Sequence, residues 1–491
     1  MMRALRIAAL FVTAFALAGC GGAEEAATGD GAKIVPASAP VFISVDSDLS
    51  SSQWQTVDDL LRKFPARPQV LSWLRSTLRE ENLDYEQDVK PALGKEIDLV
   101  WIDFADGGSN VVGLTQPKDE EAFRRLVAKS DASGDDVVLR EFRGWTIFAQ
   151  SEEAIERFRD AAVRPGDKLA DEGVFKDALA ELPDSALVKA YASGESLTQL
   201  LGRVFGGFGG GWRALPSDQR SEFIAAALAA EGDGLRLVGA QRAATEPKTK
   251  PTVFGSKLID DVPGDAVAFL TFRGKDSFST QARLSPLYRK SLKQFERELG
   301  GVPLEQLFAI FDEEVALYVR PGTPFPEVTM LVAVDGEPAE SKAFKNVDTV
   351  MKVITQFRAA QPCHAPTVED GVTVACVAFD KIEVRYAGFD GKVVVTTGQS
   401  PVTELRAAGG KLPDADAFKG SREAADVPDE TAGFLWLDVA KAVPMITGLA
   451  RAADNPLPAQ VRANLAPLTS FVAWADAEGR TTSFSAFAEI D

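Results

Sequence analysis

The sequence predicts an α+β protein of two homologous units, each a mainly antiparallel sheet with helices packed on one face. Three observations predict this class. Strand-like runs follow one another across short turns, which favours antiparallel pairing. Amphipathic runs with a helical period separate those strands. The second half of the chain also repeats landmarks of the first half in the same order, as duplicated units do.

The first residues have the pattern of an export signal. Arg3 and Arg6 precede an apolar run at 7–17, which is too short to remain as a membrane-spanning helix. Residues 17–20 read Leu-Ala-Gly-Cys and resemble the bacterial lipobox. The resemblance implies that residues 1–19 are a cleaved lipoprotein signal peptide and that the thiol of Cys20 carries a diacylglycerol. The alternative is an ordinary signal peptide with an incidental cysteine.

Residues 20–33 are small and polar and contain no aromatic side chain, so they are predicted to form a flexible tether. Two or three acyl chains hold a protein stably at a membrane. We therefore expect an exported protein, lipid-anchored to the cell envelope at the outer membrane or the outer face of the cell membrane. Gly21 stands where an aspartate would resemble the inner-membrane retention mark of two-membrane bacteria, and this favours the outer membrane.

Residues 34–243 form the first predicted unit. Its order is a strand, helices, two strands, a helix, two strands, a helix, a strand, a helix and a terminal hairpin. Trp54, Val57 and Leu61 share one face of its first helix, and Pro65 separates that helix from the next. The joint at residues 244–257 begins polar and proline-spaced, which is typical of an extended linker.

Residues 258–491 form the second predicted unit, because its segments match those of the first in order. The matching pairs are 35–45 with 262–272, 93–102 with 311–320, 143–148 with 390–395, and 168–176 with 411–419. Chance similarity would not preserve this order. The repeat also changes the interpretation of residues 223–229, whose alanines favour a helix. Their counterpart, 471–477, reads as a strand, so both segments are predicted to be strands of hairpins.

Cys363 and Cys376 flank a turn signal, Glu369-Asp370-Gly371. A hairpin centred between Glu369 and Asp370 sets the cysteines opposite each other, at a Cα separation of about 4.5–5.5 Å that suits a disulfide. In an exported protein we expect this bond, worth about 3 kcal/mol. A redox or metal pair is the alternative, but the chain lacks a C-x-x-C motif and a second histidine beside His364.

Composition argues against several classes of function. The net charge of −19 makes nucleic acid a poor partner. A single histidine leaves zinc sites and serine triads without their usual side chains, and no phosphate-binding glycine motif occurs. We therefore predict no catalytic, cofactor-binding or metal-binding residues and no cofactor. Paired carboxylates are the remaining catalytic route, and Asp103 and Asp106 at a predicted strand end fit either that role or a capped turn.

One segment stands apart from this pattern. Residues 204–212 combine five glycines with Phe205, Phe208 and Trp212, and the second unit has no equivalent. Such a loop either buries its rings against an apolar ligand, a partner or a membrane, or is an insertion whose rings pack locally. These three aromatic residues are the predicted hydrophobic contact.

Three phrases resemble a known family: Val35-Pro36 before a strand, the run 84–96 (DYEQDVKPALGKE), and Phe175-Lys176 followed by Leu-Pro-Asp at 182–184. They look like the bacterial domain-of-unknown-function family 3352, whose members resemble exported or membrane-anchored proteins with an acidic-x-x-Pro-x-Leu-Gly-x-Glu signature. The second unit keeps only Glu314 and the following strand of that signature. The resemblance implies location and fold and carries no activity.

The expected function is that of a non-catalytic envelope lipoprotein that binds or scaffolds an envelope protein or an apolar ligand. One alternative is a carboxylate-dependent hydrolase acting on envelope glycans, which needs two carboxylates about 5–10 Å apart in a cleft. The other is a purely structural spacer, which predicts no pocket in either unit.

Overall fold

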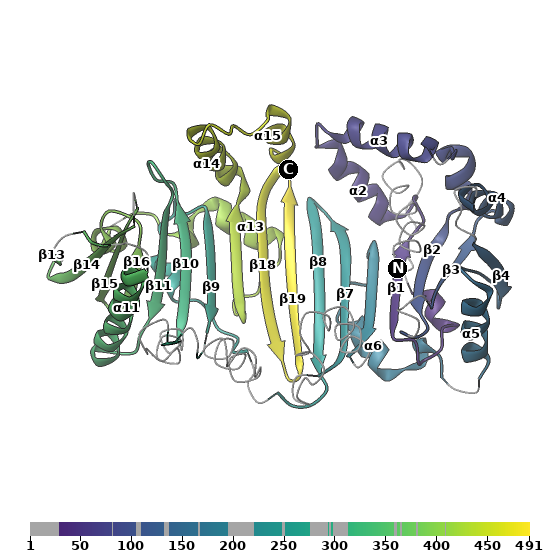
Figure 1. Ribbon diagram of the computed structural model, residues 1–491, viewed down its shortest axis with the longest axis horizontal. Helices are drawn as coiled ribbons and strands as arrows, with labels where there is room; N and C mark the ends of the chain where they lie inside the picture. The colour runs from purple at the N-terminus through teal and green to yellow at the C-terminus, as the bar shows by residue number, and fades with distance from the viewer. Residues whose placement is uncertain are drawn as a thin grey trace. The chain divides into compact units, whose positions relative to one another are not determined.

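A computed structural model describes residues 29–80, 82–104, 110–131, 137–164, 167–194, 220–247, 251–274, 313–357, 361–363, 366–379, 382–407 and 409–491, with 293, 296 and 297 as isolated positions. The described chain combines helices with antiparallel strands, so the predicted α+β class is confirmed (Figure 1). It divides into two compact units. The first comprises Met1–Pro247, Gly479–Ser485 and Ile490–Asp491, and the second comprises Lys248–Glu478 and Ala486–Glu489.

The sheet of the first unit has the strand order β4–β5–β3–β2–β1–β6–β7–β8, with every neighbouring pair antiparallel (Figure 1). The strands are β1 (Val41–Asp46), β2 (Gly94–Trp101), β3 (Val111–Pro117), β4 (Val138–Phe142), β5 (Trp145–Ala149), β6 (Val188–Ser193), β7 (Ser221–Glu231) and β8 (Gly234–Ala243). The first strand that the structure describes, β1, therefore lies in the middle of the sheet, between β2 and β6.

Helices cover both faces of this sheet, so the prediction of helices on one face is wrong. Ile147 of β5 packs in one buried cluster with Phe158, whereas its neighbour Phe148 packs in another with Phe123. Successive strand residues point to opposite faces, so α5 and α4 lie on opposite sides. The helices are α2 (Ser52–Arg62), α3 (Arg67–Glu80), α4 (Glu120–Asp131), α5 (Glu152–Val163) and α6 (Gly173–Ala180). Short turns of helix add η2 (Asp30–Lys33), η3 (Tyr85–Val89), η4 (Lys90–Ala92) and η6 (Leu169–Asp171).

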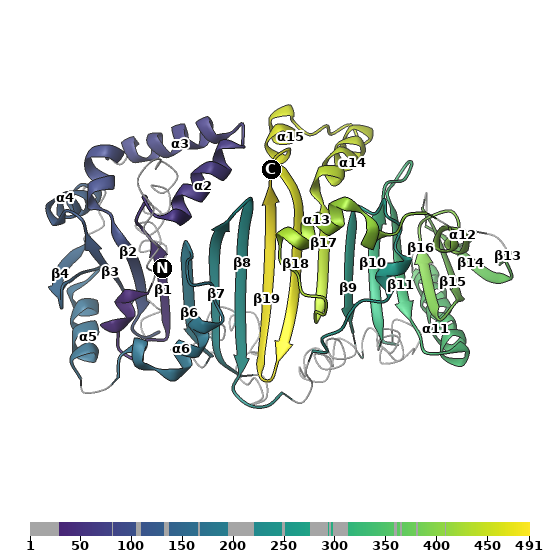
Figure 2. The same cartoon turned by 180° about the vertical axis from the view of Figure 1, so that it is seen from behind.

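The sheet of the second unit has the antiparallel order β14–β15–β16–β11–β10–β9–β17–β18 (Figure 2). The strands are β9 (Ala268–Arg273), β10 (Glu314–Arg320), β11 (Glu327–Ala333), β14 (Val372–Phe379), β15 (Ile382–Phe389), β16 (Lys392–Thr396), β17 (Gly433–Asp438) and β18 (Leu468–Glu478). Two short strands, β12 (Gln361–Pro362) and β13 (Thr367–Glu369), pair with β14, and β19 (Thr481–Ile490) ends the chain. From β15 to β18 this order is that of the first sheet from β4 to β7.

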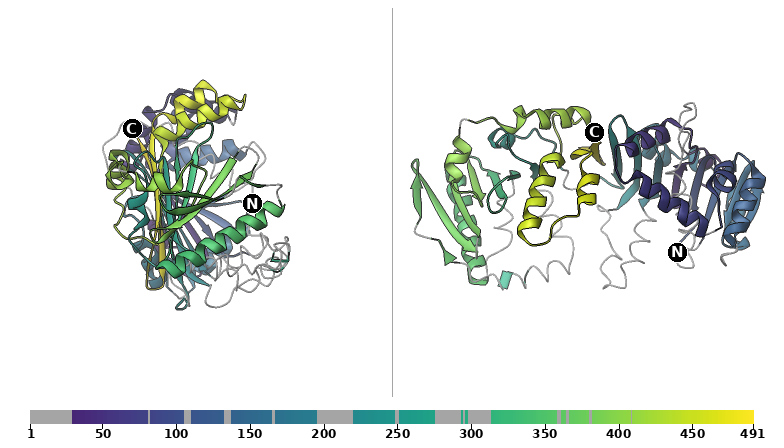
Figure 3. Two further views of the ribbon diagram at one scale, coloured as in Figure 1. Left: turned by 90° about the vertical axis from the view of Figure 1, so that its left-hand side faces the viewer. Right: turned by 90° about the horizontal axis from the view of Figure 1, so that it is seen from above.

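Helices again pack on both faces of the second sheet. Val394 of β16 belongs to a cluster with Val402 and Phe418, and its neighbour Val393 belongs to a cluster with Val347 of α11. Figure 3 shows α11 along one side of these strands. The helices are α11 (Glu337–Phe357), α12 (Pro401–Arg406), α13 (Asp416–Ala424), α14 (Val439–Ala452) and α15 (Ala459–Leu465), with the 3₁₀ turns η10 (Leu258–Asp261) and η12 (Leu412–Asp414).

Local sequence accounts for most of these elements. Ser51 and Ser151 cap α2 and α5 by accepting hydrogen bonds from the backbone N–H groups of Trp54 and Ala154. Two-residue turns join β4 to β5 and β15 to β16, and both residues of each turn have positive φ, as type I′ hairpins require. The prediction that 223–229 and 471–477 are strands is confirmed by β7 and β18.

The segment boundaries differ from the predicted ones at three places. The second unit is predicted to run to residue 491, but Gly479–Ser485 and Ile490–Asp491 belong to the first unit. The predicted tether extends to Lys33, but η2 forms from Asp30 and its Gly31 and Ala32 are buried. The predicted linker extends to residue 257, but Phe254 is buried in the second unit and its backbone pairs with that of Thr431. In the last two places the backbone bonds to a residue far along the chain: Glu96 for η2, and Thr431 for Phe254. The signal peptide and Cys20 lie outside the described residues.

Candidate functional site

A cavity of about 740 Å³ lies in the second unit. Four segments form it: the turn before β9, the end of β10, the start of α12, and the stretch that leads into η12. Its lining residues are Pro263, Gly264, Asp265, Arg320, Gln399, Ser400, Thr403, Glu404, Ala407, Gly409, Gly410, Lys411, Asp414 and Ala415. We call it the Arg320 cavity.

Arg320 is the centre of the charged wall. Its Nε and Nη2 donate to the two carboxylate oxygens of Asp265 at 2.7 and 2.8 Å. Its Nη1 lies 3.6 Å from Glu327 and 3.8 Å from Glu404. The hydrogen bond to Asp265 is the main reason that the pKa of Arg320 is raised, and burial is the main reason that the pKa of Glu404 is raised. One guanidinium therefore holds three carboxylates.

The rest of the wall combines polar groups with a larger share of apolar surface, and it leaves room. Lys411 donates from Nζ to the carbonyl oxygen of Leu405 at 3.2 Å. Ser400 caps α12 by accepting from the N–H of Thr403. A Cβ atom built on Gly409 would meet no atom within 4 Å. Carboxylates outnumber cationic groups in the lining, so the cavity suits a neutral polar or cationic ligand better than an anion.

A second charged feature lies in the core of the first unit, where Glu96 of β2 holds η2. Its carboxylate accepts from the N–H of Gly29 at 2.7 Å, from the N–H of Gly31 at 2.9 Å and from the hydroxyl of Ser44 at 3.4 Å. Burial raises the pKa of Glu96 to about 7, against the hydrogen bonds from the two glycines.

Asp98 lies two residues further along β2 and on the same face as Glu96. It has no exposed surface, and neither carboxylate oxygen has a well-aligned hydrogen-bond partner. Burial and the neighbouring Glu96 carboxylate raise the pKa of Asp98 well above its ordinary value, although Ser44 is close enough to oppose the shift. Two adjacent buried carboxylates cannot both ionise cheaply, so the raised pKa of Asp98 favours its neutral form beside Glu96.

Glu314 of β10 has the corresponding position in the second unit. It accepts from the N–H groups of Lys257 and Leu258 and from the hydroxyls of Ser256 and Thr271. Asp98 is opposite Ser44 across the first sheet, and Ala316 is opposite Thr271 across the second. Glu96 and Glu314 thus hold η2 and η10, the first helical turns among the described residues of the two units, and the first unit adds a second acid.

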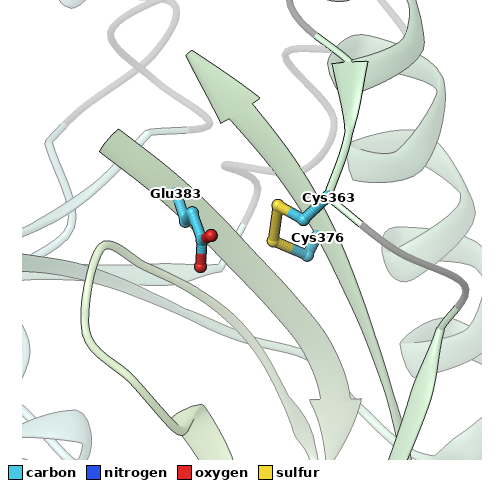
Figure 4. Close-up of side chains that lie close together, drawn as sticks. All are labelled: Cys363, Cys376 and Glu383. Atoms are coloured by element: carbon cyan, nitrogen blue, oxygen red, sulfur yellow. A yellow bond between two sulfur atoms is a disulfide. The ribbon is translucent and has the colours of Figure 1, made fainter. Parts of the chain in front are cut away.

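The predicted cysteine pair forms a disulfide, with its Cα atoms 5.5 Å apart (Figure 4). The turn lies one residue later than predicted, at Asp370-Gly371, because Glu369 pairs with Val372. A register change of two residues between β13 and β12 restores the alignment, and the N–H of Cys363 donates to the carbonyl of Cys376. Glu383 lies beside the sulfurs, but disulfide sulfurs are not thiolates and hold no metal ion.

The other predicted site residues do not belong to the Arg320 cavity, to the acid pair or to the disulfide. Asp103 accepts from the side-chain N–H of Asn110 at 2.6 Å, which fits the capped-turn interpretation. Asp106, His364 and the predicted hydrophobic contact Phe205, Phe208 and Trp212 lie outside the described residues. Among the helices that the structure describes, none is both long and apolar enough to cross a membrane.

A family described as "Protein of unknown function (DUF3352)" matches residues 3–147 and 128–487. The chain belongs to this family. No curated protein and no solved structure matches the chain. The structure explains two residues of the family signature. Glu96 at its end holds η2. Gly94 leaves no room for a side chain, because a Cβ there would lie 2.1 Å from the carbonyl oxygen of Gln116.

Sequence reasoning missed Asp98 and Arg320. The signal for Asp98 is the strand run Glu96-Ile97-Asp98, which places two acids on one face of a strand in the middle of the sheet. The signal is weak because a strand with one solvent-exposed face shows the same alternation. The Arg320 cavity has no local signal, because its walls come from segments up to about 150 residues apart in the chain.

Proposed function

We propose that this protein is an exported lipoprotein, attached to the cell envelope through Cys20, that binds a small polar or cationic ligand without catalysing a reaction. The lipobox-like residues 17–20 and the apolar run before them support the location. The Arg320 cavity supports the binding role, because it combines room for a ligand with a few charged and polar groups set in a largely apolar wall. A purely structural spacer would need no such cavity.

We also infer that the two units are copies of one ancestral unit. The support is threefold: the strand order is shared from β4 to β7 and from β15 to β18, Glu96 and Glu314 hold equivalent turns, and the isolated bridge Pro36–Lys168 has a counterpart in Pro263–Lys411. In this proposal the second unit has the binding role, and the first unit has the acid Asp98 where the second has Ala316.

The binding proposal is tested by closing the cavity. Gly409→Phe places a ring at the rim without a steric clash of its Cβ, and Gly420→Phe on α13 is the matched control, since its Cβ also meets nothing within 4 Å and Gly420 is not part of the lining. Full-length protein extracted from its own membranes is examined by native mass spectrometry. We expect a bound mass in the natural protein and in G420F that is missing from G409F. No bound mass, or the same mass in all three, refutes the proposal.

The anchor is tested separately. Cys20→Ser removes the only thiol that the lipobox offers, so the variant should either keep its signal peptide uncleaved or, once cleaved, leave the membrane fraction. If the variant is processed and sediments with membranes like the natural protein, the proposed location is wrong.

The hydrolase alternative keeps one observation in its favour. Asp265 and Glu404 line one cavity and lie 2.7 and 3.8 Å from the guanidinium of Arg320, so two carboxylates are present there, as glycosidases require. Burial raises the pKa of Glu404, as a general acid requires. Arg320 lies between them, however, where a hydrolase needs substrate or water. Release of sugars from purified cell-wall glycan that is lost in Glu404→Gln would establish the alternative.

A further inference from the structure

The core of the first unit contains a feature that the binding role does not use. Asp98 is a completely buried carboxyl group in the middle of the sheet, with β1 on one side of its strand and β3 on the other. A side chain of this kind is costly to bury. The second unit shows that the fold does not require it, because Ala316 takes its position.

The space around Asp98 is matched to η2. A Cβ atom built on Gly31 would lie 1.8 Å from Oδ2 of Asp98, so the carboxyl group lies directly against the Cα of Gly31. In the second unit the residues at the same two positions are Leu258 and Ala316, both in one apolar cluster. The pair Gly31 and Asp98 is therefore exchanged for the pair Leu258 and Ala316, with the bulk moved from the strand to the helical turn.

We propose that Glu96 and Asp98 bind one proton between them, and that loss of this proton releases the segment Gly29–Lys33 from the first unit. With the proton in place, Asp98 is neutral and Glu96 accepts the N–H groups of Gly29 and Gly31. Without it, two carboxylates lie side by side in the core, and water can solvate Asp98 once η2 moves away from it. The proton leaves to solvent, and no other group changes its charge.

The charged groups around the pair favour this response. Asp30 of η2 adds negative potential at both acids, and its exposed partner is Lys33. Lys189 of β6 is two strands away from Asp98, and its Nζ donates to the carbonyl of Asp184. Further groups on the elements packed nearby are Asp46 of β1, bonded to Ser51, and Lys168 and Asp171 at η6.

The sign follows from the direction of the shifts. Both acids have a higher pKa in the folded protein than in the unfolded chain, so their contribution to stability is complete at low pH and is lost as pH rises through the folded values. For Glu96 that passage is near pH 7 and leaves one proton on the pair. This last proton belongs to Asp98, whose pKa is raised well above its ordinary value, so the segment is held at pH 7 and opens at alkaline pH.

Hydrogen–deuterium exchange of the full chain tests the proposal. Between pH 7 and pH 10, after correction for intrinsic exchange, we expect protection of residues 29–35 to fall about tenfold or more. The peptide covering 257–262, held by Glu314 without a second acid, should change less than threefold. Asp98→Asn, which keeps the shape and removes the titrating group, should abolish the fall, and Asp98→Ala should do the same if the amide packs poorly. A pH-independent natural protein, or an unchanged fall in both variants, overturns the proposal.

Discussion

Gly31→Ala should destabilise the first unit more than an exposed glycine substitution does. The new Cβ would lie 1.8 Å from Oδ2 and 2.9 Å from Cγ of Asp98, well inside any tolerated contact. Asp98 cannot move with its strand, because β2 is paired on both sides. Overpacking of a core costs about 1–3 kcal/mol, and weakening of the Gly31 hydrogen bond to Glu96, a charge-assisted bond, adds about 1 kcal/mol. We expect a total loss of about 3 kcal/mol from these two terms.

The assay is a double-mutant cycle with Asp98→Ala in the full chain. Asp98→Ala removes the clashing carboxyl group, so Gly31→Ala should cost less than about 1 kcal/mol in that background, a coupling of about 2 kcal/mol. The two units need not unfold in one transition, so hydrogen exchange of peptides from β1 and β2 is measured together with urea unfolding to report on the first unit alone. Gly173→Ala is the control, because its Cβ meets nothing within 4 Å at the start of α6. An equal loss in both backgrounds, or no loss beyond the control, refutes the reasoning.

Three further predictions concern stability. Burial raises the pKa of Asp46 to about 6, so its contribution to stability is complete below pH 4 and is lost as pH rises through 6. From pH 4 to pH 7 the free energy of unfolding of Asp46→Asn should therefore rise by about 2 kcal/mol relative to that of the natural protein. A difference that stays constant with pH would contradict this. Replacing Cys363 and Cys376 with serine should cost about 3 kcal/mol, with exchange rising first in β12–β14; unchanged exchange there would show that the bond is dispensable. Arg320→Ala removes the guanidinium that the carboxylates of the Arg320 cavity contact, and it should lower stability by about 2 kcal/mol at pH 7 and by less at pH 4. Thermal unfolding at the two pH values measures this. An equal loss at both would show that charge is not the cause.

Much of the local structure could be predicted from the sequence. Turn signals at 143–144 and 390–391 identify hairpins, because few residues tolerate positive φ at both positions. The cysteine spacing predicts the disulfide, although the turn lies one residue later and a register change compensates. Residues 223–229 show the value of an internal comparison, since alanine-rich sequence alone favours a helix and packing in the sheet overrides that weak preference.

The two faces of the sheets show where prediction failed. Trp145–Ala149 is buried along its whole length, with no alternation of buried and exposed residues. A strand that is buried along its whole length is typical of a sheet covered on both faces, and the mainly apolar run Trp145–Ala149 was the signal against helices on one face. Which helix covers which face depends on crossovers between elements far apart in the chain, and no local pattern contains that information.

The sequence by itself determined the elements that depend on neighbours along the chain: the hairpins, the helix caps, the disulfide and the α+β class. Only the tertiary structure decided the contact between Gly31 and the buried acid Asp98, and the Arg320 cavity. Gly31 and Asp98 are 67 positions apart, and their fit depends on a contact that exists only when η2 packs on β2. The charge state of a buried carboxylate depends on burial and on neighbours from distant parts of the chain, and so does the space beside Arg320. No local stretch of sequence contains that information.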